Sequence, residues 1–185
     1  MKTINVGILG VGTVGSGVVK LLTEQAALLD KRVGGALRIR RIAEPGTPRI
    51  PVDPALLTRD AMEVLDDPQV DIVVELIGGT TVARTLCLEA LRRGKHLVTA
   101  NKALLAEHGL EIYQAAAAKR VDLGFEASVC GAIPIIRAVR EGLAANSIQS
   151  IIGIVNGTTN YILTKMTETG QAFADVLAEA QAKGY

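Results

Sequence analysis

Apolar and polar residues follow two different periods along the first two thirds of the chain. Short runs of valine, isoleucine and leucine, typical of strands buried on both faces of a parallel sheet, alternate with segments whose apolar residues recur at helical spacing. Strands are expected over residues 4–9, 37–43, 71–77, 96–99 and 121–126. Helices are expected over residues 15–30, 58–65, 81–93 and 103–119, and a proline-rich loop over 44–54. This alternation predicts an α/β fold with a doubly wound parallel sheet.

The pattern changes after Gly131, where the apolar residues become more scattered. A helix is expected over 133–143, a strand over 150–155, a polar loop over 156–160, and helices over 159–167 and 173–183. We therefore expect a dinucleotide-binding domain at residues 1–131 and the beginning of a second, α+β domain at residues 132–185. The last residues follow a helix directly, so this second domain is expected to be truncated.

A glycine loop joins the first strand to the first helix and consists of Gly10, Val11, Gly12, Thr13, Val14 and Gly15. In the dinucleotide-binding pattern Gly10 allows a tight turn, Gly12 lets the backbone approach a pyrophosphate, and Gly15 lets helix and strand pack closely. The helix N-terminus that follows supplies free N–H groups and the positive end of a dipole. A glycine turn with a purely structural role is the alternative.

The end of the second predicted strand carries charges of both signs. Glu44 is the candidate acceptor for a ribose 2′-hydroxyl, which would favour NAD, whereas Arg40, Arg41 and Arg49 could hold the 2′-phosphate of NADP. All four could also form a solvated loop edge. The residues therefore leave the choice between NAD and NADP open.

Polar groups also follow the third and fourth predicted strands, at the sheet edge where ligands of such folds bind. Gly79 and Thr80 lie in the loop after the third strand, and the glycines there permit close approach to a cofactor. Lys102 follows the fourth strand and could polarise a carbonyl or donate a proton as a hydride arrives. The alternative for Lys102 is a solvated lysine at the start of a helix.

Two further segments carry candidate ligands. Asn156, Gly157 and Thr158 open a dense polar run that could contact a substrate, or form a turn in which Thr158 or Thr159 caps a helix. Residues 126–133 offer the Glu126 carboxylate and several backbone carbonyls to a hard cation. On the residues alone this second segment is equally a linker.

Composition narrows the class of protein. Apolar residues make up 49% and charged residues 21% of the 185 residues, and the net charge is +1, which excludes a disordered chain. With 20 basic and 19 acidic residues there is no electrostatic case for a nucleic-acid partner. No apolar run approaches the roughly 18 residues of a membrane helix, and no signal peptide is expected. Cys87 and Cys130 lack metal-type spacing, so both are expected to be small buried residues of a cytoplasmic protein.

Taken together, five ordered segments resemble homoserine dehydrogenase. They are Val-Gly-Ile-Leu-Gly-Val-Gly-Thr-Val-Gly at 6–15, Val-Val-Glu-Leu-Ile-Gly-Gly at 73–79, Val-Thr-Ala-Asn-Lys-Ala-Leu at 98–104, Phe-Glu-Ala-Ser-Val at 125–129, and Gly-Ile-Val-Asn-Gly-Thr-Thr-Asn-Tyr-Ile-Leu at 153–163. The resemblance implies a Rossmann-type domain and the NAD(P)-dependent interconversion of L-aspartate 4-semialdehyde and L-homoserine. This reaction belongs to the biosynthesis of threonine, methionine and isoleucine.

The resemblance also implies roles for particular residues. The glycine loop would hold the pyrophosphate, Thr80 would lie near the cofactor, and Lys102 would sit beside the nicotinamide and the substrate oxygen. The substrate would contact Gly157, Thr158 and Tyr185. A sodium ion would be held by Glu126 and the backbone carbonyls of Val129, Gly131 and Ile133. Members of the family are commonly homodimers formed through the second domain.

The sequence departs from the family pattern at two places. Glu44-Pro45-Gly46 stands where the family often has an arginine–aspartate pair. The chain also stops before the family's substrate-binding glutamate, aspartates and second lysine, so it is expected to bind cofactor but turn over poorly. The alternatives are another two-domain dehydrogenase, such as an aspartate dehydrogenase, and a non-catalytic nucleotide-sensing module.

Overall fold

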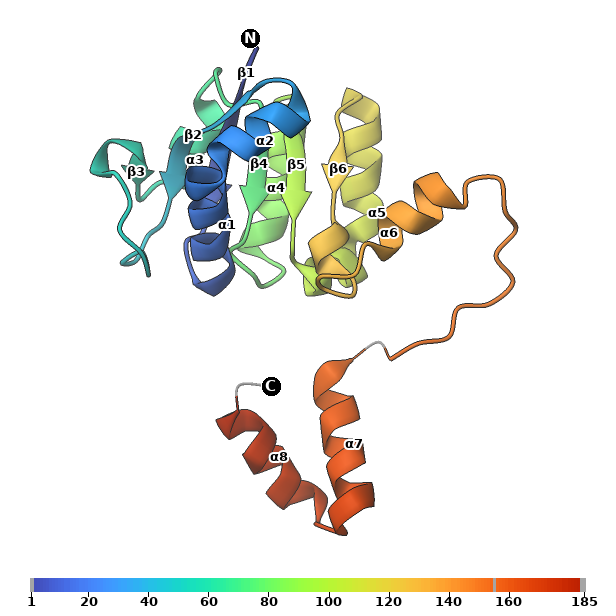
Figure 1. The fold of residues 1–185 in the computed structure, drawn as a ribbon. Helices are drawn as coiled ribbons and strands as arrows, with labels where there is room; N and C mark the ends of the chain where they lie inside the picture. Colours follow the sequence, from blue (N-terminus) through green and yellow to red (C-terminus); the bar gives the residue numbers. More distant parts are fainter. Residues whose placement is uncertain (1, 155, 184–185) are drawn as a thin grey trace. The chain divides into compact units, whose positions relative to one another are not determined.

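The computed structural model describes residues 2–154 and 156–183, and its larger part is a parallel sheet between two layers of helices (Figure 1). Within the described residues the sheet has six strands in the order β3-β2-β1-β4-β5-β6, and every pairing is parallel. The strands are β1 (Thr3–Leu9), β2 (Ala36–Ala43), β3 (Leu57–Thr58), β4 (Ile72–Glu75), β5 (His96–Thr99) and β6 (Leu123–Gly124). The predicted doubly wound parallel sheet is therefore confirmed.

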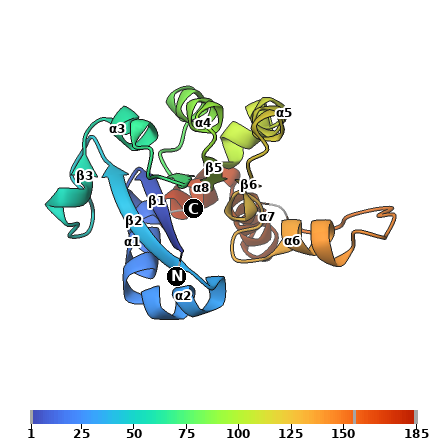
Figure 2. The ribbon, with the colours of Figure 1, turned by 90° about the horizontal axis from the view of Figure 1, so that it is seen from above.

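Helices cover both faces of this sheet, as the view in Figure 2 shows: α1 and α2 lie on one face and α3, α4 and α5 on the other. Their bounds are α1 (Thr13–Glu24), α2 (Ala26–Val33), α3 (Ala61–Asp66), α4 (Val82–Arg92) and α5 (Lys102–Lys119). Short 3-10 turns, η1 (Pro54–Leu56) and η2 (Glu126–Ser128), lie in the connections.

The central strand β1 is buried on both faces from Val6 to Leu9, which is why this part of its sequence is apolar without alternation. Ile8 and Leu9 are both fully buried but belong to different core clusters, because neighbouring side chains of a strand point to opposite faces. One cluster packs Leu9 with residues of α3, α4 and α5, and the other packs Ile8 with Val19 of α1. With few aromatic residues available, valine, leucine, isoleucine and alanine build both clusters.

Between residues 15 and 126, three of the expected elements differ in the structure. The helix expected over 15–30 is broken at Gln25, whose φ of −104° and ψ of 16° are not helical, so α1 and α2 are separate. A single non-helical residue barely disturbs the spacing of apolar positions, so periodicity does not reveal it. The helix expected over 58–65 begins only at Ala61, because Asp60 caps it and Thr58 pairs with β2. The last strand, expected over 121–126, is confined to β6.

The chain divides into two compact units, Met1–Gly142 and Leu143–Tyr185. Residues 132–142, which the sequence analysis assigns to the second domain, lie in the first unit. The helix expected at 133–143 is there in two pieces, α6 (Ile135–Arg137) and the π-helical turn η3 (Ala138–Gly142). The second unit contains a helical hairpin of α7 (Gly157–Thr169) and α8 (Phe173–Ala182), held together by Ile162, Val176 and Ala180.

The strand expected over 150–155 is wrong for its described part, residues 150–154, which form no regular structure; Val155 lies outside the described residues. Ile151, Ile152 and Ile154 are 74%, 96% and 73% exposed. A strand needs a hydrogen-bonding neighbour, and no described residue pairs with this segment. An apolar run in the sequence does not show whether such a neighbour is present.

Candidate functional site

The strand order reverses between β1 and β4. The chain leaves β1 for β2 and β3 on one side and returns to β4, β5 and β6 on the other. Ligands of open α/β sheets bind at this switch point, beyond the carboxyl ends of the strands. The glycine loop follows β1 and the loop 77–81 follows β4, so both reach this edge. The N–H of Leu76 donates to the carbonyl of Leu9 at 2.8 Å, which joins the two segments.

The three glycines of the loop meet different surroundings. Gly10 has a φ of +94°, and a Cβ there would lie 2.9 Å from the carbonyl oxygen of Leu76. A Cβ at Gly15 would overlap the carbonyl oxygen of Gly10. A Cβ at Gly12 would have no described atom within 4 Å apart from those of its chain neighbours. Gly10 and Gly15 therefore serve the tight turn and the close packing that the sequence predicts, and Gly12 leaves open space over the loop.

The N-terminus of α1 opens onto this space. Gly12 is its N-cap, and no side chain of the described residues caps the helix. Val11 is buried in the core, whereas Thr13 and Val14 are exposed. The unsatisfied N–H groups and the dipole of a helix end of this kind favour an anion.

Glu44 and Arg49 both contact the glycine loop. The Glu44 carboxylate accepts the N–H of Val11 at 2.7 Å through one oxygen and the N–H of Gly46 at 3.0 Å through the other. The Arg49 guanidinium donates to Thr13 Oγ1 at 2.7 Å. An acidic and a basic group therefore lie at the end of β2, beside the loop.

The other two candidate arginines point to different partners. Arg40 is ion-paired with Asp67 at 3.0 Å and Arg41 with Glu63 at 3.2 Å. Both partners come from α3 and the turn after it. Of the three arginines that the sequence offers for a 2′-phosphate, only Arg49 is hydrogen-bonded to the glycine loop within the described part of the chain.

Gly79 and Lys102 come from loops that are tied together. Asn101 Nδ2 donates to the carbonyl of Gly79 at 2.7 Å, while its Oδ1 accepts the N–H of Leu104 at 3.1 Å and so caps α5. Lys102 is the first residue of α5 and is exposed. The Lys102 ammonium has no hydrogen-bond or ion-pair partner among the described residues. Thr80, in the loop that contains Gly79, is half-buried.

A buried acidic residue, Glu75, lies beneath these loops and was not singled out from the sequence. It is the last residue of β4, its side chain is fully buried, and Thr99 Oγ1 donates to it at 2.6 Å. The signal in the sequence is one charged residue inside an apolar strand that a parallel sheet buries on both faces.

The Glu126 carboxylate is turned toward α6. Its two oxygens accept the N–H groups of Ile136 at 2.8 Å and Arg137 at 3.0 Å. The backbone carbonyls of Glu126 and Ile133 also accept hydrogen bonds, from the N–H groups of Val129 and Ile135. One carboxylate with several carbonyls remains a donor set that suits a hard cation, but in this conformation the carboxylate serves as the cap of a helix.

The substrate candidates of the second unit lie at the start of α7. Asn156 is the N-cap, and its Oδ1 accepts both the N–H and the hydroxyl of Thr159 at 2.8 Å. The cap is therefore Asn156 and not Thr158 or Thr159. Gly157 is the first helical residue and Thr158 is half-buried. Tyr185 lies outside the described residues.

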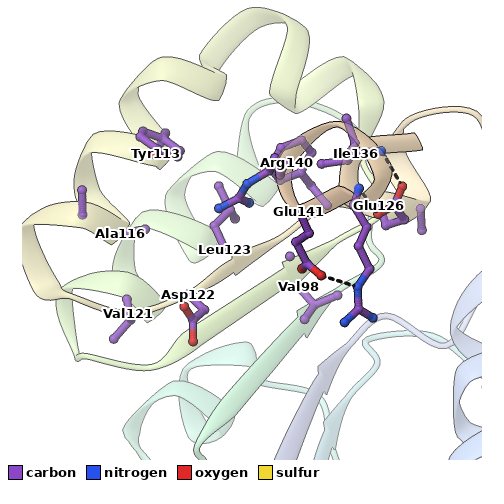
Figure 3. A pocket seen from close by; sticks show the side chains of 15 residues that line it. Val98, Tyr113, Ala116, Val121, Asp122, Leu123, Glu126, Ile136, Arg140 and Glu141 are labelled. Carbon is purple, nitrogen blue, oxygen red and sulfur yellow. Dashed lines mark hydrogen bonds and ion pairs between the residues drawn. The ribbon is translucent and has the colours of Figure 1, made fainter. Parts of the chain in front are cut away.

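A pocket of about 660 Å³ lies away from the glycine loop, between α5, β6 and α6 (Figure 3). Tyr113 of α5 lines it together with Glu126, Arg140 and Glu141. Arg137 also lines the pocket and donates to Glu141 at 2.9 Å. Neither the glycine loop nor Lys102 lines this pocket, so the hollow is separate from the switch-point edge.

The two cysteines differ in exposure. Burial, and then the nearby charge of Glu75, raises the pKa of the Cys87 thiol, which suits an unreactive core residue. Cys130 is exposed, so the expectation that both are buried is wrong for it. Its φ of +49° belongs to the irregular segment after η2, where the chain has left the sheet. Among residues 2–154 and 156–183 no cluster of His, Cys, Asp or Glu could hold a metal, and no helix is long and apolar enough to cross a membrane.

Comparisons with known proteins agree along the chain. The model of the homoserine dehydrogenase NAD-binding domain matches residues 10–126, and the homoserine dehydrogenase model matches residues 134–185. The homoserine dehydrogenase of Neisseria gonorrhoeae is 50% identical and that of Corynebacterium glutamicum also 50%, each over 100% of this chain.

Solved structures show the same relationship. The crystal structure of a homoserine dehydrogenase from Thiobacillus denitrificans matches 100% of this chain with a TM-score of 0.91 and 49% identity. A hyperthermophilic archaeal homoserine dehydrogenase in complex with NADPH matches 98% of it with a TM-score of 0.82 and 25% identity. The chain spans 43% of the Neisseria and Thiobacillus proteins and 61% of the archaeal chain. With the two family models together matching most of its length, the chain belongs to the homoserine dehydrogenase family.

Proposed function

We propose that this chain carries the cofactor-binding part of a homoserine dehydrogenase, an enzyme that interconverts L-aspartate 4-semialdehyde and L-homoserine with NAD(P)(H). One arrangement supports this proposal above all. The open glycine loop, the loop of Gly79 and Thr80, and the ammonium of Lys102, which has no partner among the described residues, all lie at the carboxyl edge of the sheet. Neither a purely structural glycine turn nor a solvated lysine requires that combination.

The residues present fit a dinucleotide. The pyrophosphate would lie over Gly12, where the backbone is open, and against the uncapped N-terminus of α1. The adenosine ribose would reach Glu44 at the end of β2. Gly79 and Thr80 would flank the cofactor on the other side of the switch point, toward Lys102.

The chemistry then follows from the position of Lys102. The cofactor, when bound, supplies or accepts the hydride. The Lys102 ammonium donates a hydrogen bond to the substrate oxygen, which stabilises the negative charge that develops there as the carbonyl is reduced. In the direction of homoserine oxidation, the same ammonium holds the substrate oxygen in place.

Several finer features stay predictions. They are substrate contacts from Asn156, Gly157, Thr158 and Tyr185, a sodium ion at Glu126, Val129, Gly131 and Ile133, a homodimer, a cytoplasmic location, and a place in threonine, methionine and isoleucine biosynthesis. Residues 156–158 support the first through their polarity and their place at a helix start. The donor types of residues 126–133 support the second.

Reduction of NAD⁺ and NADP⁺ by the protein that carries this chain tests the proposed reaction, with L-homoserine and L-aspartate as alternative substrates. Activity with L-homoserine supports the proposal. Activity with L-aspartate alone would make the protein an aspartate dehydrogenase. Tight cofactor binding without turnover of either compound would favour a nucleotide-sensing module.

Glu44 and Arg49 are expected to set the choice of cofactor in opposite directions. Because the Glu44 carboxylate would repel a 2′-phosphate, Glu44→Gln should shift the ratio of the NADH and NADPH dissociation constants about tenfold toward NADPH. Arg49→Gln should shift the ratio toward NADH, because it removes the cation beside the loop. Fluorescence titration with each cofactor measures both ratios.

Arg40→Gln is the matched control for these two variants. Arg40 is paired with Asp67 and makes no hydrogen bond to the glycine loop, so its loss should leave the ratio unchanged. A Glu44→Gln variant with the wild-type ratio would remove Glu44 from the ribose site.

A further inference from the structure

Glu75 is a fully buried carboxylate with an unusual set of partners. Its Oε1 accepts the N–H groups of Ile77 at 2.8 Å and Gly78 at 3.1 Å, and its Oε2 accepts the hydroxyl of Thr99 at 2.6 Å. No lysine, arginine or histidine of the described residues forms an ion pair with it. Hydrogen-bond donors alone therefore satisfy this carboxylate.

Such a group is costly to bury. An acidic side chain in the interior loses its hydration and is tolerated only where hydrogen bonds replace it. Apolar residues of similar size would fill the same space without that cost. The position of Glu75 therefore calls for a reason beyond filling the core, and its three donors indicate what that reason is.

Two of the donors belong to the loop after β4. The N–H groups of Ile77 and Gly78 donate to the Glu75 carboxylate. Gly78 and Gly79 then adopt left-handed conformations, with φ values of +82° and +70°. A left-handed pair of glycines has little conformational preference of its own. The hydrogen bonds to the Glu75 carboxylate therefore fix the conformation at the start of this turn.

The third donor connects Glu75 to the next strand. Thr99 Oγ1 donates to Glu75 and accepts the N–H of Asn101 at 3.0 Å, and Asn101 in turn donates to the carbonyl of Gly79 at 2.7 Å. These hydrogen bonds, with those from Ile77 and Gly78 to Glu75, form a closed network that joins the loop after β4 to the loop after β5. Ser128 adds a bond from its hydroxyl to the carbonyl of Thr99 at 2.8 Å.

We propose that Glu75 is a positioning residue, which holds the Gly78–Gly79 turn and the start of α5 in register so that the cofactor meets Lys102. This inference rests on the proposed function, because the turn and Lys102 are where that function places the nicotinamide. Glu75 acts only through backbone groups and Thr99, and it does not touch the cofactor.

The test uses the Glu75→Gln variant of the full chain. The amide has the same size but only one acceptor oxygen, so either the N–H groups of Ile77 and Gly78 or the hydroxyl of Thr99 loses its acceptor. We expect the folded variant to bind NADH and NADPH at least about tenfold more weakly. We also expect faster hydrogen exchange at the amides of Ile77, Gly78 and Asn101, with exchange elsewhere near wild type.

Val64→Ala is the matched control for a general loss of stability. Val64 is fully buried in α3 and contacts neither loop through a hydrogen bond. Its truncation should lower the melting temperature, while the folded protein keeps wild-type cofactor affinity and wild-type exchange at the three amides. Equal losses of affinity in the two variants would overturn the inference.

A second variant covers the case in which Glu75→Gln does not fold. Thr99→Val keeps the shape and the carboxylate but removes one donor, and it should show the same pattern more weakly. Wild-type affinity and wild-type amide exchange in the folded variants would overturn the inference. If the wild-type chain bound neither cofactor, the proposed function would fail, and the amide exchange would still decide whether Glu75 fixes the loops.

Discussion

In the full-length protein that carries this chain, replacing Lys102 with alanine is expected to lower the rate of L-homoserine oxidation by about two to four orders of magnitude. The ammonium has no partner among the described residues, so its removal breaks no contact that the fold uses. Cofactor affinity and thermal stability should therefore stay close to wild type. Steady-state kinetics and cofactor titration of the same preparation measure the two effects separately.

Lys119→Ala is the control, because Lys119 is an exposed lysine at the other end of the same helix. It should leave turnover unchanged. A Lys102→Ala variant with wild-type turnover would remove this residue from the mechanism, and the proposed role of the β5 edge would fail with it.

The second large effect is expected at Gly12. A Gly12→Val variant should fold, since a Cβ at this position meets open space, but the new side chain would occupy the space over the loop. Cofactor affinity should fall by about a hundredfold or more, because the pyrophosphate can no longer approach the backbone. Circular dichroism reports folding, and fluorescence titration reports binding.

Gly17 gives a matched comparison within α1, because a Cβ there also meets open space. Gly17→Ala should bind cofactor normally and raise stability slightly through helix propensity. Gly15→Ala should instead destabilise the fold, because its Cβ would overlap Gly10. If Gly12→Val bound cofactor as tightly as Gly17→Ala, the pyrophosphate would have to lie elsewhere.

The sheet and its switch point could be predicted because they depend on local patterns. Strands β1 and β4 contain short apolar runs, and the alternation of strands and helices leaves few topologies. Strand β3 has only two residues, so no apolar run predicts it. The glycine loop could be predicted for the same reason. The positions of its glycines follow from the tight turn at Gly10 and the close packing at Gly15, which folds of this class share.

What could not be predicted depends on partners distant in sequence. Arg40 and Arg41 are ion-paired with Asp67 and Glu63, and no local pattern in the sequence predicts such pairs. Glu75 gains its role only when β4 and β5 lie side by side and bring Thr99 to it. The isoleucine-rich sequence of residues 150–154 predicts a strand, but a strand forms only when a neighbouring strand accepts and donates its backbone hydrogen bonds.

Titration of this chain with NADH and NADPH tests the central claim most directly. Cofactor fluorescence follows binding, and circular dichroism establishes that the protein is folded. We expect saturable binding that Gly12→Val weakens about a hundredfold or more and that Glu44→Gln and Arg49→Gln shift between the two cofactors. A folded chain that binds neither cofactor would contradict the assignment of the glycine loop as a dinucleotide site.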